Sequence, residues 1–547
     1  MITKIIRTST FGLLCFIFSA YANTDCIPRE TKYGLVCVCT SSYCDYLENP
    51  QPISDNVVVI TSSKEGQRFA VTNLRFGDDN TDFENSAVVA DNRRNIVKLL
   101  VNGTKRLFGL NDPIKLSIDR SVEYQKITGF GGAFTGTVSH LLGILDQQLQ
   151  DHIYKSYYHK DGIGFNMLRT PIGGCDFDLE PWAYNELPEN DANLSNFTKL
   201  DPRDEVKIQQ IERLKNISNL NELRIMAAAW SPPRWMKSNG EWTGFGKLKE
   251  EFYQSWADYH LRFLQLMDAK KMPVWAISTG NEPFNGNVFV FFVHFMSLGW
   301  VPRTQAVWLN DFLGPTIRNS TYKDVLIFGN EDQRYSYPAW FKEMDAFRPG
   351  VLDYLNGFAV HWYWDEFLAP IVMDKTVEKY PGKILLNTES CIGDKPWQTH
   401  GPELGSWNRG QIYASAYLKN LQHSYNGWID WNIVLDEQGG PNYVENFVDA
   451  PVIVNATNRV EIYKQPIFYA MGHFSKFVPK GSVRIEAEVK KLLTSLEVVA
   501  FKRPDERIVV VLLNSDGKAV DVLLNDSVQG EIKINVPANS WHTIIYN

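Results

Sequence analysis

The sequence VWAISTGNEP, residues 274–283, joins an apolar run of strand length to a carboxyl side chain. The run predicts a buried strand, and Pro283 prevents its simple continuation, so Glu282 is expected at the carboxyl end of that strand. A second run, KILLNTE at residues 383–389, also ends on a glutamate, Glu389. Two glutamates at the ends of buried strands indicate a site that acts on glycosidic bonds.

Outward from these two runs, strand-length apolar stretches alternate with longer amphipathic stretches. Eight strand candidates can be counted: residues 126–130, 165–171, 223–230, 274–281, 325–330, 357–362, 383–389 and 428–433. Helical patterns lie between them, for example at residues 247–269 and 304–313. This alternation predicts an α/β fold, a (β/α)8 TIM barrel, in which the carboxyl ends of the strands share one mouth.

The two ends of the chain have the alternating pattern of exposed-face strands. The candidates are residues 57–60, 67–74 and 95–101 near the N-terminus, and 496–501, 507–513, 520–524, 531–536 and 541–546 near the C-terminus. The first three strands are too few to close a core alone, so we expect one β-sandwich built from both termini. The predicted boundaries are 50–119 plus 482–547 for the sandwich, and 120–435 plus 466–481 for the catalytic barrel, with its last helix at 466–478.

The first 22 residues have the pattern of a secretory signal peptide. Lys4 and Arg7 give a basic start, residues 11–20 an apolar centre, and residues 20–22 (AYA) a small-residue cleavage site. We therefore expect residues 1–22 to be removed and the mature chain to follow the secretory pathway.

Six cysteines remain once Cys15 leaves with the signal peptide. Four crowd near the new N-terminus, which in an oxidising compartment indicates two disulfides in a small, loop-rich unit: Cys26, Cys37, Cys39 and Cys44. A zinc knuckle is the alternative, and four cysteines permit three pairings. We expect residues 23–49 to pair with 436–465 as a small β subdomain. Cys175 and Cys391 are expected to be free, buried thiols.

The composition excludes some classes of partner. A net charge of −8 gives no reason to expect nucleic acid, and no motif indicates a metal or another cofactor. After the signal peptide no apolar run approaches the roughly 20 residues that a membrane helix needs. Seven Asn-x-Ser/Thr sequons are candidate glycosylation sites that fit the secretory route: Asn102, Asn193, Asn196, Asn216, Asn319, Asn455 and Asn525. The oligomeric state is not indicated by the sequence.

The chemistry expected at the mouth needs one protonated and one ionised carboxyl group. We assign Glu282 as the acid and base and Glu389 as the nucleophile, with Arg169 as the cation that keeps the nucleophile ionised. Asn281 is placed to hold the 2-hydroxyl of a sugar. The alternative is that each glutamate is a carboxylate that simply faces a loop.

Aromatic and imidazole side chains also end strands. Tyr363 is expected to hydrogen-bond one of the carboxylates, and His361 is either a member of the site or a satisfied structural residue. Trp230 and Trp431 are either the floor beneath a sugar ring or part of the core, because large aromatic residues serve both purposes.

Several ordered motifs resemble one known family. They are GFGGA at 129–133, residues 275–283, AVHWY at 359–363, TESC at 388–391, GWIDWN at 427–432, GGPN at 439–442 and GHFSKF at 472–477. Together they are similar to the lysosomal acid β-glucosidase (glucosylceramidase) family, from Cys26 to near the C-terminus.

The resemblance implies a retaining hydrolase that cleaves glucosylceramide to glucose and ceramide, with Glu282 and Glu389 in the roles assigned above. It implies a lysosomal location, disulfides Cys26–Cys37 and Cys39–Cys44, no metal, a saposin-type activator and an anionic lipid surface. It also implies two sets of site residues: Trp230, Asn281, Trp431 and Asn446 to hold glucose, and Arg169, His361 and Tyr363 to support the carboxylates.

Two stretches depart from the family pattern. The family has an aspartate that contacts outer glucose hydroxyls where this chain has Gly136, so the alternatives are the same mechanism on another β-glycoside, or a weakly active relative that binds glycolipid. Residues 288–296 (VFVFFVHFM) replace an aromatic loop at the mouth. They are expected to contact a lipid tail or membrane, or else to pack as a buried segment.

Overall fold

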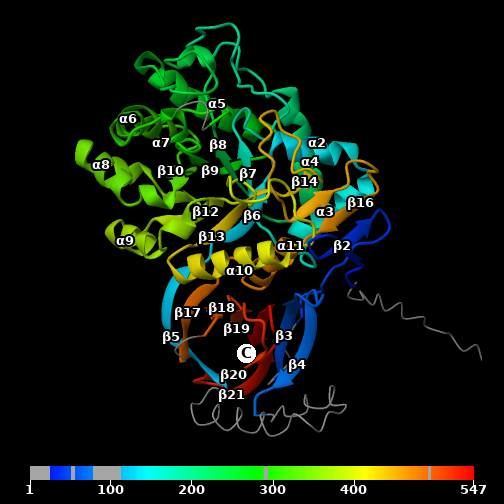
Figure 1. Ribbon diagram of the computed structural model, residues 1–547. Coiled ribbons are helices and arrows are strands. Elements are labelled where there is room, and N and C mark those ends of the chain that lie inside the picture. The colour runs from blue at the N-terminus through cyan, green and yellow to red at the C-terminus, as the bar shows by residue number, and fades with distance from the viewer. Residues whose placement is uncertain (1–24, 51–55, 78–111, 289–292, 491–493) are drawn as a thin grey trace, which may run out of the picture.

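The computed structural model describes residues 25–50, 56–77, 112–288, 293–490 and 494–547. The signal peptide, the strand expected at residues 95–101, the sequon Asn102 and part of the segment 288–296 lie outside the described residues. The chain forms a barrel, a β-sandwich and a small β subdomain beside the barrel, as Figure 1 shows.

The barrel consists of eight parallel strands closed in the order β10-β11-β12-β13-β6-β7-β8-β9. Their bounds are β6 Gly129–Ala133, β7 Met167–Pro171, β8 Arg224–Ala228, β9 Val274–Ser278, β10 Leu326–Gln333, β11 Gly357–His361, β12 Ile384–Glu389 and β13 Gly427–Asn432. The (β/α)8 prediction is therefore confirmed. The first strand begins at Gly129, because its glycines allow close approach: a Cβ on Gly131 would lie 2.2 Å from the carbonyl oxygen of Met167.

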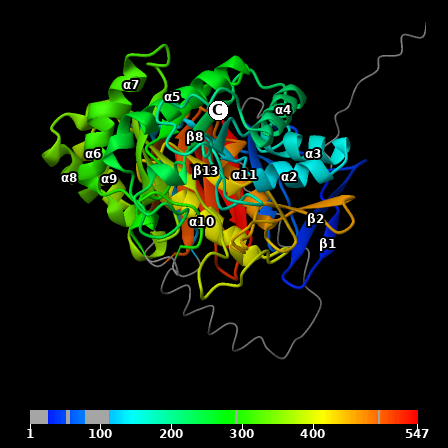
Figure 2. The same ribbon diagram turned by 90° about the horizontal axis from the view of Figure 1, so that it is seen from above.

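Helices surround the strands, as the view from above in Figure 2 shows. They are α2 Gly136–Ile144, α3 Gln147–Tyr158, α4 Pro202–Ile217, α5 Tyr253–Ala269, α6 Pro302–Trp308, α7 Gly314–Arg318, α8 Ala339–Phe347, α9 Ile371–Lys379, α10 Trp407–Gln422 and α11 Pro466–Ser475. Local sequence sets several starts: the side chain of Asp201 caps α4 just before a proline, and that of Ser406 caps α10. The helix expected at 304–313 divides into α6 and a π-helical turn, Leu309–Leu313.

The sandwich is one nine-stranded sheet whose inner face encloses a core of its own, lined by Val57, Ile114, Ile485 and Ile532 among others. The bounds are β3 Asn56–Ser63, β4 Ala70–Arg75, β5 Ile114–Lys126, β17 Val483–Lys490, β18 Leu496–Lys502, β19 Ile508–Asn514, β20 Val520–Asp526, β21 Gly530–Val536 and β22 Ser540–Tyr546. Both termini contribute strands, so the predicted sandwich is confirmed. Strand β17 was not predicted from the sequence, and the predicted boundary at residue 119 is wrong, because β5 continues unbroken to Lys126.

The small subdomain is a five-stranded sheet in the order β1-β2-β16-β15-β14. Its strands are β1 Pro28–Glu30, β2 Leu35–Thr40, β14 Val434–Asp436, β15 Val452–Val454 and β16 Glu461–Lys464. Cys26 is bonded to Cys37 and Cys39 to Cys44. This subdomain joins the N-terminal residues to the chain that follows the last barrel strand.

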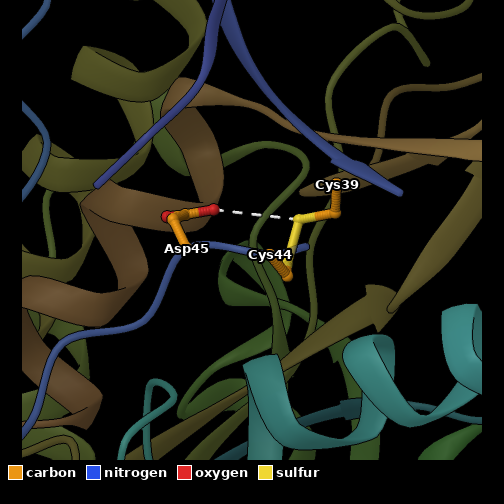
Figure 3. A group of neighbouring side chains, drawn as sticks. All are labelled: Cys39, Cys44 and Asp45. Carbon is orange, nitrogen blue, oxygen red and sulfur yellow. Dashed lines mark hydrogen bonds between the residues drawn. A yellow bond between two sulfur atoms is a disulfide. The ribbon is translucent and has the colours of Figure 1, made fainter. Parts of the chain in front are cut away.

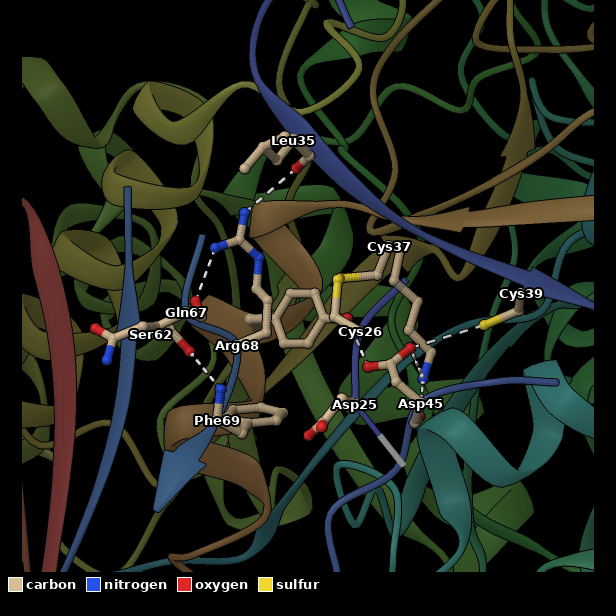
Figure 4. The surroundings of a disulfide bond; sticks show 12 residues. Asp25, Cys26, Leu35, Cys37, Cys39, Asp45, Ser62, Gln67, Arg68 and Phe69 are labelled. Atoms are coloured by element: carbon tan, nitrogen blue, oxygen red, sulfur yellow. Dashed lines mark hydrogen bonds and ion pairs between the residues drawn. A yellow bond between two sulfur atoms is a disulfide. The ribbon is translucent and has the colours of Figure 1, made fainter. Parts of the chain in front are cut away.

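The three parts meet around Arg68, shown in Figure 4. Its guanidinium donates to the carbonyl oxygen of Leu35 in the small subdomain and stacks on Trp407 of α10 and Tyr469 of α11. Trp407 also stacks on Trp541 of β22 with ring centroids 3.9 Å apart. Contacts of this kind fix the barrel to both neighbouring parts.

Candidate active site

Glu282 and Glu389 lie together at the mouth of the barrel. Glu389 is the last residue of β12, and Glu282 follows β9 in a turn where Gly280 and Glu282 both have positive φ angles, 118° and 42°. One oxygen of each carboxylate lies within 4.8 Å of the other and of a ring nitrogen of His361. Both glutamates are buried, with exposed fractions of 9% for Glu282 and 6% for Glu389.

Glu389 is held by a cation and a phenol. Arg169 on β7 donates from Nη1 to Oε2 at 2.6 Å, and the hydroxyl of Tyr363 donates to Oε1 at 2.7 Å. Burial raises the pKa of Glu389 above its ordinary value, although His361 and Arg169 act in the opposite direction. Positive charge next to this carboxylate favours its ionised form.

Arg169 is completely buried and contacts four further groups. Its Nε lies 2.8 Å from Glu331 Oε1, and its Nη2 donates to Asn281 Oδ1 at 2.6 Å. The guanidinium carbon lies 4.7 Å from the ring centroid of Trp230 and 5.3 Å from that of Trp431. Arg169 therefore fixes the position of the nucleophile candidate, of Asn281 and of the two indoles at once.

Glu282 has different neighbours. Its Oε1 accepts from Nε2 of Gln333 at 2.8 Å and lies 2.8 Å from Nδ1 of His361, while its Oε2 accepts from the amide of Asn285. Asp332 lies behind it, where its Oδ2 accepts from the backbone N–H of Phe284. Two neutral amides and one imidazole thus surround the carboxylate that β9 delivers.

His361 connects the two sides of the site. Burial opposes its positive form, but the charge of Glu389 and hydrogen bonds to Glu282 and Glu331 outweigh burial and raise its pKa to about 10. Burial also acts against ionised Glu331, yet Arg169 and His361 lower the pKa of that carboxyl to about 2. The site therefore contains two buried cations and an ionised carboxylate that face the glutamate pair.

A third carboxyl group, Asp176, lies near the same pair. Burial, followed by the charges of Glu389 and Glu282, raises its pKa to about 8. Its Oδ2 accepts from the side-chain amide of Asn446 at 3.3 Å. Asp176 and Asn446 therefore offer a polar edge to whatever occupies the space before the two glutamates.

The residues singled out from the sequence form one connected group in the structure. Trp230 stacks on Trp431 with ring centroids 5.5 Å apart, and both are buried. The contacts described above link Arg169, Asn281, Glu282, His361, Tyr363 and Glu389. Asn446 contacts Asp176, whose pKa the two glutamates raise.

Five polar neighbours of the pair were missed from the sequence: Asp176, Asn285, Glu331, Asp332 and Gln333. Three of them lie in β10, whose end was placed at residue 330 although the strand continues to 333. The signal was present, because an apolar run followed by Glu-Asp-Gln is the pattern that identified the other two glutamates.

The lack of a side chain at Gly136 does not leave an empty space in the site. A Cβ built on Gly136 would lie 1.6 Å from Oδ1 of Asp178, whose other oxygen accepts from the backbone N–H of Cys175. The Asp178 carboxyl thus fills the space that a side chain at 136 would need. The carboxyl that faces the glutamate pair is that of Asp176.

Two groups in the described residues have the spacing of metal ligands. In the first, Cys39, Cys44 and Asp45 (Figure 3), the two sulfurs are bonded to each other, so neither is a free thiolate. In the second, Glu282, His361 and Glu389, Arg169 already supplies positive charge and a protonated imidazole has no lone pair for a metal. The donor chemistry fits a hydrogen-bonded acid–base site.

The other sequence candidates lie on the surface or in the core. The side chains of five sequon asparagines are exposed: Asn193, Asn196, Asn216, Asn319 and Asn525. Asn455 is half-buried and donates to the hydroxyl of Tyr463. Cys175 and Cys391 are free and buried, and Cys391 Sγ lies 3.5 Å from the Tyr363 hydroxyl.

The described end of the apolar segment 288–296 packs inward. Val293 and Met296 are buried, and Met296 belongs to the cluster that contains Trp230 and Trp431. For these residues the structure supports the buried alternative. Within the ranges that the structure describes, no helix has both the length and the apolar character needed to cross a membrane.

Sequence comparison adds an independent line of evidence. Residues 127–478 match the glycosyl hydrolase family 30 TIM-barrel domain, and residues 481–544 match the family's beta sandwich domain. The chain belongs to glycosyl hydrolase family 30. It is thus a glycoside hydrolase, which agrees with the chemistry expected from two strand-end glutamates.

Family 30 relatives differ in how much of the chain they resemble. The lysosomal acid glucosylceramidase of Mus musculus is 35% identical over 548 residues, which cover 99% of each chain. An endo-1,6-beta-D-glucanase of Trichoderma harzianum is 24% identical over 447 residues, 78% of this chain and 86% of that protein. The resemblance to the glucosylceramidase family is therefore confirmed.

Solved structures confirm the family 30 architecture. The crystal structure of SrfJ from Salmonella typhimurium matches with a TM-score of 0.75 and 23% identity, over 90% of this chain and 99% of that one. At this identity the likeness concerns the fold, a barrel with an attached sandwich.

Proposed function

We propose that the protein is a retaining β-glucosidase in which Glu389 is the nucleophile and Glu282 is the acid and base. The observation that carries the proposal is that one oxygen of Glu389 lies within 4.8 Å of one oxygen of Glu282. Retaining glycosidases need their carboxyl groups about 5 to 5.5 Å apart, whereas inverting enzymes leave about 6.5 to 9.5 Å for a water molecule.

The proposed reaction has two steps. Ionised Glu389 attacks the anomeric carbon while Glu282 gives its proton to the departing glycosidic oxygen, so that a glycosyl ester forms and the alcohol leaves. Ionised Glu282 then takes a proton from water, whose oxygen attacks the same carbon and releases Glu389. Both inversions together retain the β configuration.

The surroundings of each glutamate support these roles. Arg169 and Tyr363 contact both oxygens of Glu389, which stabilises the carboxylate before attack and after release. Amides from Gln333 and Asn285 orient Glu282 without adding charge. These neutral amides suit a group that changes its protonation state twice in each cycle, while the protonated His361 at 2.8 Å favours its ionised form.

The sugar is proposed to lie against Trp230 and Trp431, with polar contacts from Asn281, Asn446 and Asp176. The indoles offer flat apolar surfaces to the C–H groups of a pyranose ring. Asn281 lies next to Glu282 in the chain and accepts a hydrogen bond from Arg169, which supports the proposal that its amide holds the 2-hydroxyl. Asp176 is proposed to contact the outer glucose hydroxyls in place of the aspartate that the family has at position 136.

We propose glucosylceramide as the substrate, cleaved to glucose and ceramide. The support is the similarity to the Mus musculus lysosomal acid glucosylceramidase over nearly the full length of both chains. The same similarity supports a location in the secretory pathway, in the lysosome or outside the cell. A saposin-type activator and an anionic lipid surface are proposed as partners on the ground of the family resemblance alone.

The mechanism is tested by trapping the glycosyl ester. An activated 2-deoxy-2-fluoro-β-glucoside should inactivate the enzyme with time, and peptide mass spectrometry should find the sugar on Glu389. A label on another carboxylate would overturn the assignment, and a product with inverted configuration, measured by NMR, would overturn the retaining mechanism.

Two other functions remain as alternatives. The first is the same mechanism on another β-glycoside, which is favoured by the similarity to an endo-1,6-beta-D-glucanase. The second is a weakly active protein that binds glycolipid. Rates on 4-methylumbelliferyl β-glucoside, β-xyloside and β-galactoside, and on glucosylceramide in anionic vesicles, separate the three, because each predicts a different fastest substrate or none.

A further inference from the structure

A cleft with a volume of about 380 Å³ lies between the barrel and the sandwich. One wall is the outer face of α10, the other is formed by the loops after β11 and β12, and residues of the sandwich close the base. Its inner end reaches Tyr363 and Cys391, but neither catalytic glutamate lines it. Clefts at domain boundaries are common positions for small-molecule sites.

The charged groups that line the cleft are paired with each other. Arg334 forms an ion pair with Asp365, and Lys395 forms one with Asp394. Each pair consists of one positive and one negative side chain, so it adds no net charge to the wall.

A third opposite-charge set lies at the base. Ser415 donates to both oxygens of Glu497 at 2.9 and 3.0 Å, and Lys419 is the cation that faces this carboxylate. Glu366, which is exposed, is the remaining carboxylate of the lining. An anion would have to compete with the paired carboxylates, and among the described residues of the lining a cation would find only the exposed Glu366 outside the pairs, whereas a neutral ligand leaves the pairs intact.

Two side-chain amides on α10 have unused hydrogen-bonding groups. Asn408 and Gln411 lie one helical turn apart on the face that lines the cleft, and neither side-chain amide has a hydrogen-bond partner among the described residues. Each amide offers both a donor and an acceptor. Trp362 and Tyr363 present aromatic surface at the inner end. A lining that combines free amides with aromatic rings suits a ligand ring that carries hydroxyl groups on its edge and C–H groups on its face.

We propose that this cleft is a second ligand site, which takes a neutral polyhydroxylated molecule of the size of a mono- or disaccharide. Its inner end contacts the ring of Tyr363, whose hydroxyl donates to Glu389. Occupancy of the cleft is therefore communicated to the catalytic carboxylate through one side chain. The site does not depend on which glycoside the enzyme hydrolyses.

The test is a binding measurement on the full-length mature protein with its catalytic pocket filled by an iminosugar. Cellobiose and methyl β-glucoside are the probes, and saturation-transfer NMR gives their dissociation constants. We expect saturable binding that Gln411→Leu and Asn408→Leu each weaken at least tenfold. Gln148→Leu, a change of an exposed amide on α3, is the matched control and should leave binding unchanged.

Three results would overturn the proposal. They are equal binding by parent and α10 variants, loss of all sugar binding when the iminosugar is present, and tighter binding of inorganic phosphate or spermidine than of either sugar. Melting temperatures of the variants establish that they fold, and a crystal of the parent protein soaked in cellobiose locates the sugar independently of the variants. None of these measurements requires turnover, so they stand apart from the test of the glucosidase mechanism.

Discussion

The ends of β9 and β12 carry the same residue type in contrasting surroundings. Glu389 on β12 is contacted by a buried guanidinium, whose own charge is balanced by Glu331. Glu282 beyond β9 is contacted by the amides of Gln333 and Asn285 and by His361. Glu389 is thus held by an arginine and a phenol, and Glu282 by two neutral amides and the protonated imidazole of His361.

This difference shows how the same fold can give two carboxyl groups different roles in one reaction. A carboxylate that must remain ionised benefits from fixed positive charge, whereas one that gains and loses a proton benefits from neutral donors that tolerate both states. If the roles follow the surroundings, changes on the β12 side should act on charge, and changes on the β9 side should act on orientation.

The largest expected effect comes from removing each carboxyl group in turn. Glu389→Gly should lower kcat on an aryl β-glucoside by at least about 10⁴-fold, because no covalent intermediate can form. Glu282→Gly should lower it by about 10² to 10⁴-fold, and least for leaving groups that need no proton.

Azide distinguishes the two roles directly. In Glu389→Gly, azide occupies the nucleophile's place and attacks the substrate once, so the product should be an α-glucosyl azide. In Glu282→Gly it attacks the glycosyl ester, so the product should be a β-glucosyl azide. Proton NMR identifies the anomer of each product. A β-glucosyl azide from Glu389→Gly and an α-glucosyl azide from Glu282→Gly would reverse the assignment.

The next effect concerns the ion pairs on the β12 side. Glu331→Gln removes one of the two carboxylate partners of Arg169, in a place where both side chains are fully buried. Breaking a buried pair by removing one partner costs about 3 to 5 kcal/mol of the free energy of unfolding, which urea denaturation measures.

Glu343→Gln is the matched control, because Glu343 pairs with Arg303 on the surface with both side chains largely exposed. This change should cost between about 0 and 1 kcal/mol. Equal losses in the two variants would mean that the network around Arg169 contributes no more than a surface contact.

The sequence predicted the barrel, the sandwich and the glutamate pair because each depends on a local pattern. Strands such as β9 and β12 end an apolar run on a glutamate, so their side chains could be assigned to the mouth. Glu331 and Asp176 were not assigned. The first lay beyond an end placed three residues early, and the second lies in a loop after β7, where no periodicity indicates which way a side chain points.

Asp176 lies close enough to the two glutamates for their charges to raise its pKa, and its titration should therefore affect stability. Its folded-state pKa is about 8 and its ordinary value 3.8, so between these values the folded chain keeps a proton that the unfolded chain has released. The free energy of unfolding therefore falls as pH rises through this range, by up to about 1.4 kcal/mol per pH unit from this group.

Asp176→Asn cannot release that proton. Relative to the parent, the variant should therefore become steadily more stable from pH 5 to pH 7, which urea denaturation at several pH values measures. Asp201→Asn offers a contrast, because hydrogen bonds and Arg203 overcome burial there and lower the pKa of that carboxyl. A stability difference between Asp176→Asn and parent that does not change with pH would place Asp176 in a solvated setting, away from the glutamates.

The smallest effect is expected on the β9 side. Gln333→Ala removes one of three groups that contact Glu282 and leaves His361 and Asn285 in place. A single neutral hydrogen bond contributes about 1 kcal/mol, which corresponds to about a fivefold fall in kcat/KM. The loss should appear mainly in kcat with poor leaving groups, because these depend most on a well-oriented acid. A fall in activity as large as that of Glu282→Gly would show that one orienting amide matters as much as the carboxyl group itself, and the contrast between the two strand ends would then disappear.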